Sequence, residues 1–157
     1  MVVKNADDDE RISIVLMIKG HDVKCVQFSP SRWSVLHEYV DDINIAARAV
    51  DIGDSNIKLR LHLGAAYHVS VTSGYRCVDI RKFYRPYRAT EADIKPTRRG
   101  VALRFDEWAH LCSLMQSLRN DHPSLKLAHP CHLDHPDQPT FFTCLECSPF
   151  ADCMWTL

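Results

Sequence analysis

The sequence predicts an α+β fold in which successive short strands lead into amphipathic helices. Three observations support this prediction: apolar or alternating stretches typical of strands, two stretches with apolar residues at helical spacing, and turn residues between them. The expected order is strand–strand–helix in residues 11–53, then strand–strand–strand–strand–helix in residues 57–120. With 157 residues, the chain has room for one domain and a small appendage.

The first block follows residues 1–10, an acidic segment that we expect to be a flexible tail. Residues 11–18 are mostly apolar, which is typical of a buried strand. Residues 22–28 alternate as a second strand, with either Cys25 or Val26 facing the core.

A helix over residues 30–50 is predicted from its N-terminal signal. Ser29 can cap the free backbone N–H groups, and Pro30 suits the first helical position because its missing N–H is not needed there. Gly53 can end the helix. The apolar face at helical spacing consists of Trp33, Leu36, Val40, Ile43 and Ala47.

The second block alternates between apolar and polar residues more cleanly than the first. Turn residues separate its segments, and a polar loop precedes the last strand. The predicted elements are strands at 57–63, 67–72 and 75–84, a polar loop at 86–96, a short strand around 101–103 and a helix at 106–118.

The two predicted helices carry the same apolar pattern. A tryptophan is followed by apolar residues three, seven and ten positions later, and a large apolar strand residue precedes both helices at the same offset. This pattern predicts that residues 11–53 are a strand–strand–helix half copy of the module in residues 57–120. The second set is Trp108, Leu111, Met115 and Leu118, preceded by Leu103 as Phe28 precedes the first.

The net charge of −1 conceals a strongly basic segment at residues 76–104. Nine Lys and Arg residues stand there against three acidic residues, with Phe83, Tyr84 and Tyr87 among them and Tyr75 directly before the segment. A local positive field attracts a phosphate backbone, and aromatic rings offer surfaces on which unpaired bases stack. The pattern therefore predicts binding of single-stranded nucleic acid, against the alternative of a solvated basic face with core aromatics.

Residues 78–84 (VDIRKFY), residues 94–103 (IKPTRRGVAL) and Trp108 together resemble the transcriptional coactivator family called positive cofactor four. The resemblance covers about residues 67–118, and several constraints occur in order. Thr97 stands where the family often has Gly, and Tyr84 where it often has Trp.

The resemblance implies a curved four-stranded antiparallel sheet followed by a helix, and a role in transcription through contacts with single-stranded DNA or melted duplex. Family members are dimers whose helices pack together, so this chain could pair its two helices internally as a pseudo-dimer or form a homodimer. Transcription proteins are expected as further partners. The DNA-contacting positions carried over are Arg81, Tyr84, Lys95, Arg98 and Arg99, with Tyr75 and Arg76 matched only loosely.

The tail, residues 129–157, is rich in cysteine and histidine. Two closely spaced pairs, H-x-x-H and C-x-x-C, suit the tetrahedral coordination of a structural zinc ion. The candidate ligands are His132, His135, Cys144 and Cys147, with Cys131 as an alternative to either histidine; Cys153 lies further on. The other interpretation is an inert or redox-active tail.

Several classes of protein are not favoured by the sequence. Its apolar runs are too short to cross a bilayer, and an acidic N-terminus is unlike a secretory signal, so we expect no membrane partner and a cytoplasmic or nuclear, most simply nuclear, protein. No H-E-x-x-H, G-x-S-x-G or phosphate-binding glycine loop occurs, so we expect no enzyme. The alternative function is a protein-interaction adaptor that retains the fold without DNA binding.

Overall fold

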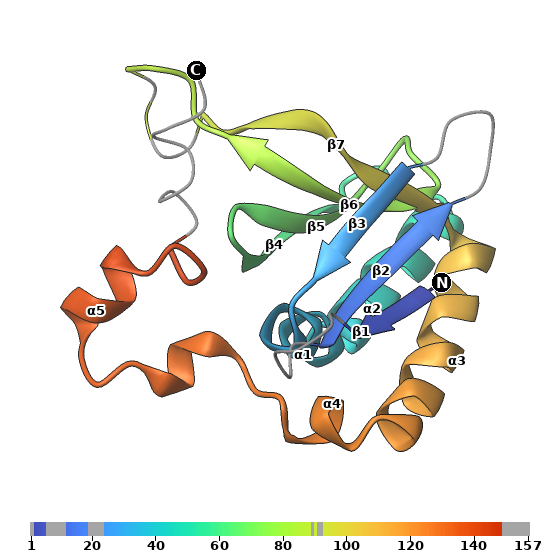
Figure 1. The fold of residues 1–157 in the computed structure, drawn as a ribbon. Helices are drawn as coiled ribbons and strands as arrows, with labels where there is room; N and C mark the ends of the chain where they lie inside the picture. Colours follow the sequence, from blue (N-terminus) through green and yellow to red (C-terminus); the bar gives the residue numbers. More distant parts are fainter. Residues whose placement is uncertain (1, 6–11, 19–23, 89, 91–92, 149–157) are drawn as a thin grey trace.

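Two antiparallel sheets share one group of helices in the computed structural model, which describes residues 2–5, 12–18, 24–88, 90 and 93–148 (Figure 1). The predicted α+β class, with four antiparallel strands followed by a helix, is confirmed. The longest runs of regular structure come from the blocks identified by their hydrophobic periodicity.

The smaller sheet has the order β1-β2-β3, with β1 at Val2–Asn5, β2 at Ile12–Ile18 and β3 at Lys24–Phe28. The prediction of a flexible tail was wrong for β1, which pairs antiparallel with β2. The strand β2 is strongly apolar, and β3 pairs with only one of its two edges. The short β-prone stretch near the N-terminus forms backbone hydrogen bonds along the other edge. The rest of that acidic tail lies outside the described residues. In β3, Val26 and Phe28 are buried and Cys25 is exposed, which settles the alternation.

The larger sheet has the order β4-β5-β6-β7, and every neighbouring pair is antiparallel. Its last strand begins earlier than predicted, inside the stretch expected to be a loop. The register between β6 and β7 shifts after Arg81, and this irregularity lets β7 continue along β6 as far as Tyr84. The strands are β4 at Lys58–Gly64, β5 at Tyr67–Thr72, β6 at Cys77–Tyr84 and β7 at Lys95–Arg104.

The predicted helix over residues 30–50 is divided into α1, Pro30–Glu38, and α2, Val40–Asp51. Its N-terminal signal is confirmed, because Ser29 Oγ accepts a hydrogen bond from the Arg32 N–H at 3.1 Å. The division at Tyr39 lets α1 pack on β2 and β4 while α2 packs on β5 and β6. Gly53, at φ +96°, ends α2: its N–H donates to Val50 O and the next N–H donates to Ala49 O.

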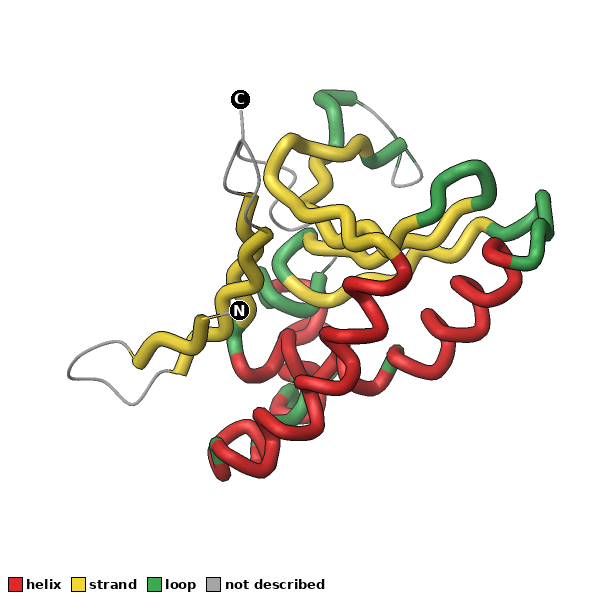
Figure 2. Tube along the Cα trace, turned by 90° about the vertical axis from the view of Figure 1, so that its right-hand side faces the viewer, coloured by secondary structure: helices red, strands yellow, loops and turns green. Residues whose placement is uncertain are grey.

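The third long helix, α3 at Phe105–Asp121, lies on β6 and β7, so all three helices cover one face of the larger sheet (Figure 2). A short helix, α4 at Pro123–Leu127, follows. Trp33, Ile43 and Trp108 are buried in one continuous core. Trp108 Nε1 also donates to Asn44 Oδ1 of α2 at 2.8 Å, so a hydrogen bond links α2 and α3.

Gly100 on β7 lies directly against the backbone of β6. A Cβ atom added there would lie 2.2 Å from Arg81 Cβ and 2.7 Å from Ile80 O, and neither the strand backbone nor a Cβ can move aside cheaply. We expect Gly100→Ala to destabilise the fold by about 1–3 kcal/mol because the β6–β7 ladder must separate. Urea unfolding would measure the loss. The matched Ala102→Gly exchange in the same strand should cost about 1 kcal/mol or less, and equal losses would contradict the steric argument.

Candidate metal centre and nucleic-acid surface

Four side chains of the tail converge on one point. They are Cys131, His135, Cys144 and Cys147, whose ligand atoms all lie within 4.8 Å of one another. The Sγ atoms of Cys131 and Cys144 are 3.8 Å apart, and Cys131 Sγ lies 3.7 Å from His135 Nε2. A zinc tetrahedron with Zn–S bonds of about 2.3 Å has S–S edges of about 3.8 Å, so the thiols already have the spacing of zinc ligands. They are too far apart for a disulfide.

Short helical turns deliver these ligands. The 3₁₀ helix η1, Cys131–Asp134, presents the first cysteine, and α5, Gln138–Thr143, precedes the C-x-x-C turn. Asp137 caps α5 by accepting from the Thr140 N–H at 2.9 Å. The turn closes as the Ser148 N–H donates to Cys144 O at 3.0 Å.

His132 is not part of the cluster, although the H-x-x-H spacing favoured it. His135 follows η1 in an extended conformation, at φ −86° and ψ 126°, and therefore leaves the i, i+3 alignment that would have placed both histidines together. Cys131 takes that position, which resolves the ambiguity left by the sequence. Cys153 lies outside the described residues.

The thiols need a cation if all are to ionise. Burial, followed by hydrogen bonds from Cys131 and Cys144, raises the pKa of Cys147, and burial raises the pKa of Cys131. Three thiolates this close would repel one another, whereas a bound metal ion deprotonates its thiol ligands. Three sulfurs and one imidazole nitrogen complete a four-coordinate shell, which is typical of structural zinc sites and leaves no position for a substrate.

The C-x-x-C turn is attached to the rest of the protein through Glu146. The Glu146 carboxylate receives Arg32 Nε and Nη2, both at 2.9 Å, and Glu146 O accepts from the Ala65 N–H at 2.9 Å. Arg32 also lies over the Tyr67 ring at 5.0 Å. Gly64, at φ +132°, makes room, since a Cβ there would lie 2.3 Å from Glu146 Oε1. The metal cluster and the β4–β5 hairpin therefore meet at one contact.

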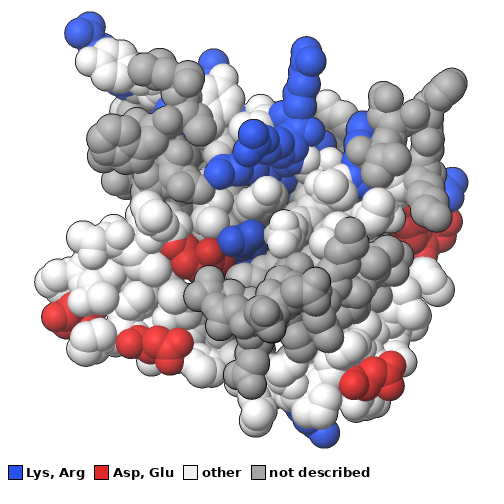
Figure 3. Space-filling model, in the orientation of Figure 1, with Lys and Arg blue, Asp and Glu red and all other residues white. Residues whose placement is uncertain are grey.

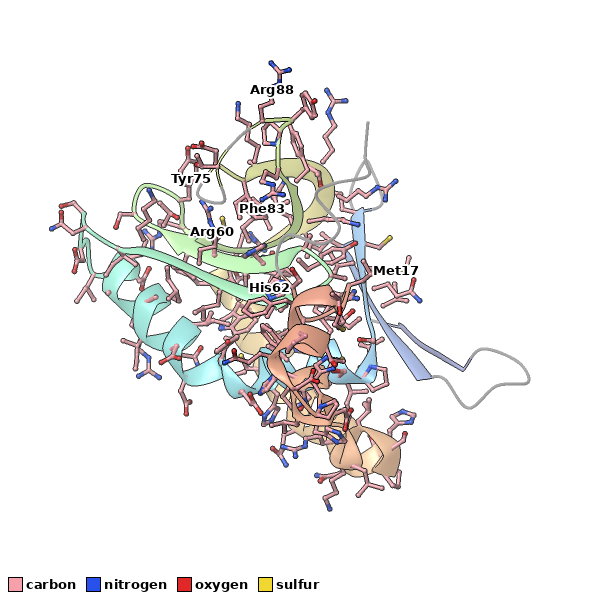
Figure 4. All side chains as sticks on the ribbon, turned by 90° about the vertical axis from the view of Figure 1, so that its left-hand side faces the viewer. Met17, Arg60, His62, Tyr75, Phe83 and Arg88 are labelled. Carbon is pink, nitrogen blue, oxygen red and sulfur yellow. The ribbon has the colours of Figure 1, made fainter. Side chains whose placement is uncertain are left out.

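A second candidate site is the outer face of the larger sheet, opposite the helices. Alternation along β6 places Arg81 and Phe83 on this face, and they line a hollow of about 410 Å³ together with Tyr75. Arg60 of β4 lies over the Phe83 ring at 4.9 Å, so its guanidinium plane covers the buried ring (Figure 4). Arg60 lies outside the basic segment 76–104, but the alternation of residues 57–63 could have placed it on this face.

Two of the predicted DNA contacts are already engaged within the protein. Arg81 Nε and Nη2 donate to both carboxylate oxygens of Asp79, at 2.6 and 2.8 Å, and Nη1 donates to Thr97 O. Arg76 forms an ion pair with Asp51. These contacts hold the guanidinium groups in place, and Arg81 in particular braces the irregular part of the β6–β7 ladder. Tyr75, in contrast, is 68% exposed.

The remaining predicted contacts lie at the start of β7 and the end of β6. Lys95, Arg98 and Arg99 are exposed, and within the described residues none forms an ion pair with a carboxylate. Arg99 lines a second hollow with Tyr84. On the face drawn in Figure 3, most Lys and Arg side chains gather in the upper half, where Figure 1 shows β6 and β7.

Two histidines lie on the same outer face beside Arg60. The His62 and His68 rings are 5.1 Å apart, and His68 contacts Phe83 at 5.0 Å. Burial, followed by the charge of His68, lowers the pKa of His62 to about 4. Burial likewise lowers the pKa of His68 to about 4, although its hydrogen bond to Ala66 O opposes the shift. Both imidazoles are neutral at pH 7.

Comparison with protein-family models, curated proteins and solved structures finds no match. The resemblance to positive cofactor four therefore stays a prediction. Among the described helices, none combines the length and apolarity needed to cross a membrane.

Proposed function

We propose that the protein binds single-stranded DNA across the outer face of the larger sheet. The observation that carries the proposal is a hollow bordered by the Arg60 guanidinium and the exposed Tyr75 ring, which β7 reaches through Pro96. Lys95, Arg98 and Arg99 lie next to Pro96 along the same strand, and all three are exposed. Cations can contact phosphates, while planar groups can stack on unpaired bases. The resemblance to positive cofactor four supports the same surface and a role in transcription in the nucleus.

The residues of this surface have different proposed roles. Because Asp79 and Thr97 O accept hydrogen bonds from all three nitrogens of the Arg81 guanidinium, we assign this side chain to supporting the sheet. Phosphate binding is assigned to Lys95, Arg98 and Arg99, which we call the rim cations. Stacking is assigned to Tyr75 in the first hollow and to Tyr84, which lies beside Arg99 in the second hollow at the end of β6. Stacking contributes about 1–3 kcal/mol per base and tolerates any sequence, so this face should show little sequence specificity.

Removing the positive charges of the three rim cations tests the proposal. Lys95→Gln, Arg98→Gln and Arg99→Gln together should weaken binding of a single-stranded oligonucleotide on the order of tenfold or more, and should flatten its log–log salt dependence by about 2, because each lost phosphate contact releases fewer counterions. Fluorescence anisotropy at several salt concentrations measures both quantities. Tyr84→Ala should lower affinity without changing the slope.

The matched control removes three cations from the helices on the opposite face. Arg48→Gln, Arg119→Gln and Lys126→Gln should leave the salt slope within experimental error. An unaltered affinity in the rim variant would refute the assignment. Weak, salt-insensitive retention of DNA by the native protein would instead favour a protein-interaction adaptor that has kept the fold.

We also propose that the Cys131–His135–Cys144–Cys147 cluster holds a structural zinc ion. The tetrahedral spacing of the thiols supports zinc, as does the borderline-soft donor set of three sulfurs and one imidazole. The closed shell favours a role in folding the tail, so we propose that the protein is not an enzyme.

We further propose that the helices pair inside one chain as a pseudo-dimer. The Trp108–Asn44 hydrogen bond joins α3 to α2, and β3 lies alongside β7, its equivalent in the suggested half copy. These contacts are those expected if residues 11–53 replace a second subunit.

A further inference from the structure

A cavity of about 190 Å³ lies where three parts of the chain meet: the α1–α2 division, the end of β4 and the metal-bearing tail. Its walls combine apolar surface with about as much polar surface, and they include Cys131 and Cys147 of the candidate metal cluster. Three of its polar lining residues, Ser31, Glu38 and His62, carry side chains that can form hydrogen bonds with an occupant.

Two buried polar atoms at this cavity lack a hydrogen-bond partner among the described residues. They are Ser31 Oγ and His62 Nε2, and both residues line the cavity. A buried polar group without a partner costs free energy, so both atoms favour an occupant that offers hydrogen-bonding groups. Glu38, exposed at the edge of the cavity, adds a carboxylate acceptor.

We propose that this cavity receives one pyrimidine base of the bound strand, with cytosine preferred. A cavity of about 150 Å³ accommodates benzene, so a six-membered base fits this one and a purine fits less well. The cytosine edge presents an amino donor beside two acceptors. Glu38 matches the amino group, while the Ser31 hydroxyl and the neutral His62 N–H can donate to the two acceptors. Thymine places a carbonyl oxygen opposite Glu38 and is disfavoured.

The cavity adjoins the proposed DNA surface. Arg60 and His62 are two residues apart on β4 and therefore point to the same face, about 7 Å from each other along the strand. Figure 4 shows Phe83, Arg60 and His62 following one another down the sheet. The inference rests on the proposed function in that the polymer lies on the sheet face and delivers one base to the cavity, which thereby adds base preference to a surface that otherwise has little.

Free nucleosides test the cavity without requiring the sheet face. Full-length, zinc-loaded protein would be titrated with deoxycytidine, thymidine and deoxyadenosine, following the imidazole signals of His62 by NMR. Deoxycytidine should bind on the order of tenfold more tightly than thymidine, since matching or opposing one base edge changes affinity by about that factor. Glu38→Gln should remove this preference, because an amide can also donate to the thymine oxygen. Asp42→Asn, an exposed carboxylate of α2 outside the cavity, should leave it unchanged.

The outcomes separate this inference from the proposed function. The Lys95, Arg98 and Arg99 triple variant should bind deoxycytidine as the native protein does while losing affinity for oligonucleotides. Absence of nucleoside binding, equal binding of all three nucleosides, or a preference that survives Glu38→Gln would overturn the base pocket. Oligonucleotide binding with a normal salt slope in any of those cases would leave the sheet face standing.

Discussion

Removing zinc should unfold residues 129–148 while the two sheets and α1–α3 stay folded. The segment has little apolar core of its own, and Cys147 is its one buried ligand among the described residues. Zinc binding contributes about 10–16 kcal/mol to the folding of small zinc-dependent peptides, far more than the short helices of this tail can supply. Purified protein should contain about one zinc per chain, and a chelator should make the tail sensitive to protease.

Cys144→Ser with Cys147→Ser should reproduce the effect of the chelator. Cys25→Ser with Cys77→Ser, which alters two cysteines outside the cluster, should retain the metal and the protease resistance. Since the C-x-x-C turn holds Glu146 against Arg32, loss of the metal should also break the ion pair between these two side chains. A metal-free native protein whose tail is equally resistant would refute the zinc site.

Acidification should destabilise the protein between pH 6.5 and 4 through His62 and His68. Above pH 6.5 both imidazoles are neutral in the folded and unfolded states, so they add no pH dependence. Below pH 6.5 the two histidines are protonated in the unfolded chain but stay neutral in the folded protein, because folding lowers the pKa of His62 and of His68 to about 4. Stability is thus lost as pH falls, by about 3 kcal/mol for each imidazole when pH 4 is reached.

Denaturant unfolding at a series of pH values measures this slope. His62→Gln with His68→Gln should flatten it, since glutamine does not titrate, although the native protein can remain the more stable one at pH 7. Arg60 and Arg32 are the charged groups that oppose protonation and would stay in place. An exposed histidine offers the control: His110→Gln should leave the slope unchanged. A double variant with the native slope would contradict the assignment.

The sequence was most informative where one local signal sufficed. The limits of the first helical region were predicted correctly from Ser29, Pro30 and Gly53. Capping and a positive φ depend only on single residues and their neighbours. The alternation of apolar and polar residues located the strands of the larger sheet. In the tail, the spacing of the cysteines and histidines alone indicated a cluster of metal ligands.

The features that could not be predicted depend on contacts between distant residues. Tyr39 divides a helix without a glycine or proline, because α1 and α2 pack on different strands. The early start of β7 follows from its pairing with β6, and β1 exists through its pairing with β2. The exclusion of His132 reflects a backbone change at His135 that the spacing alone does not encode.

Because the hydrogen bond from Trp108 to Asn44 joins two helices of the same chain, the contact between them should not depend on protein concentration. A helix pair drawn from two chains dissociates on dilution, and its melting temperature rises with protein concentration. A pair contained in one chain is intramolecular, so its association does not depend on dilution and each substitution alters only one of the two partners. A substitution in α2 therefore leaves the sequence of α3 unchanged, so the two helices can diverge independently of each other.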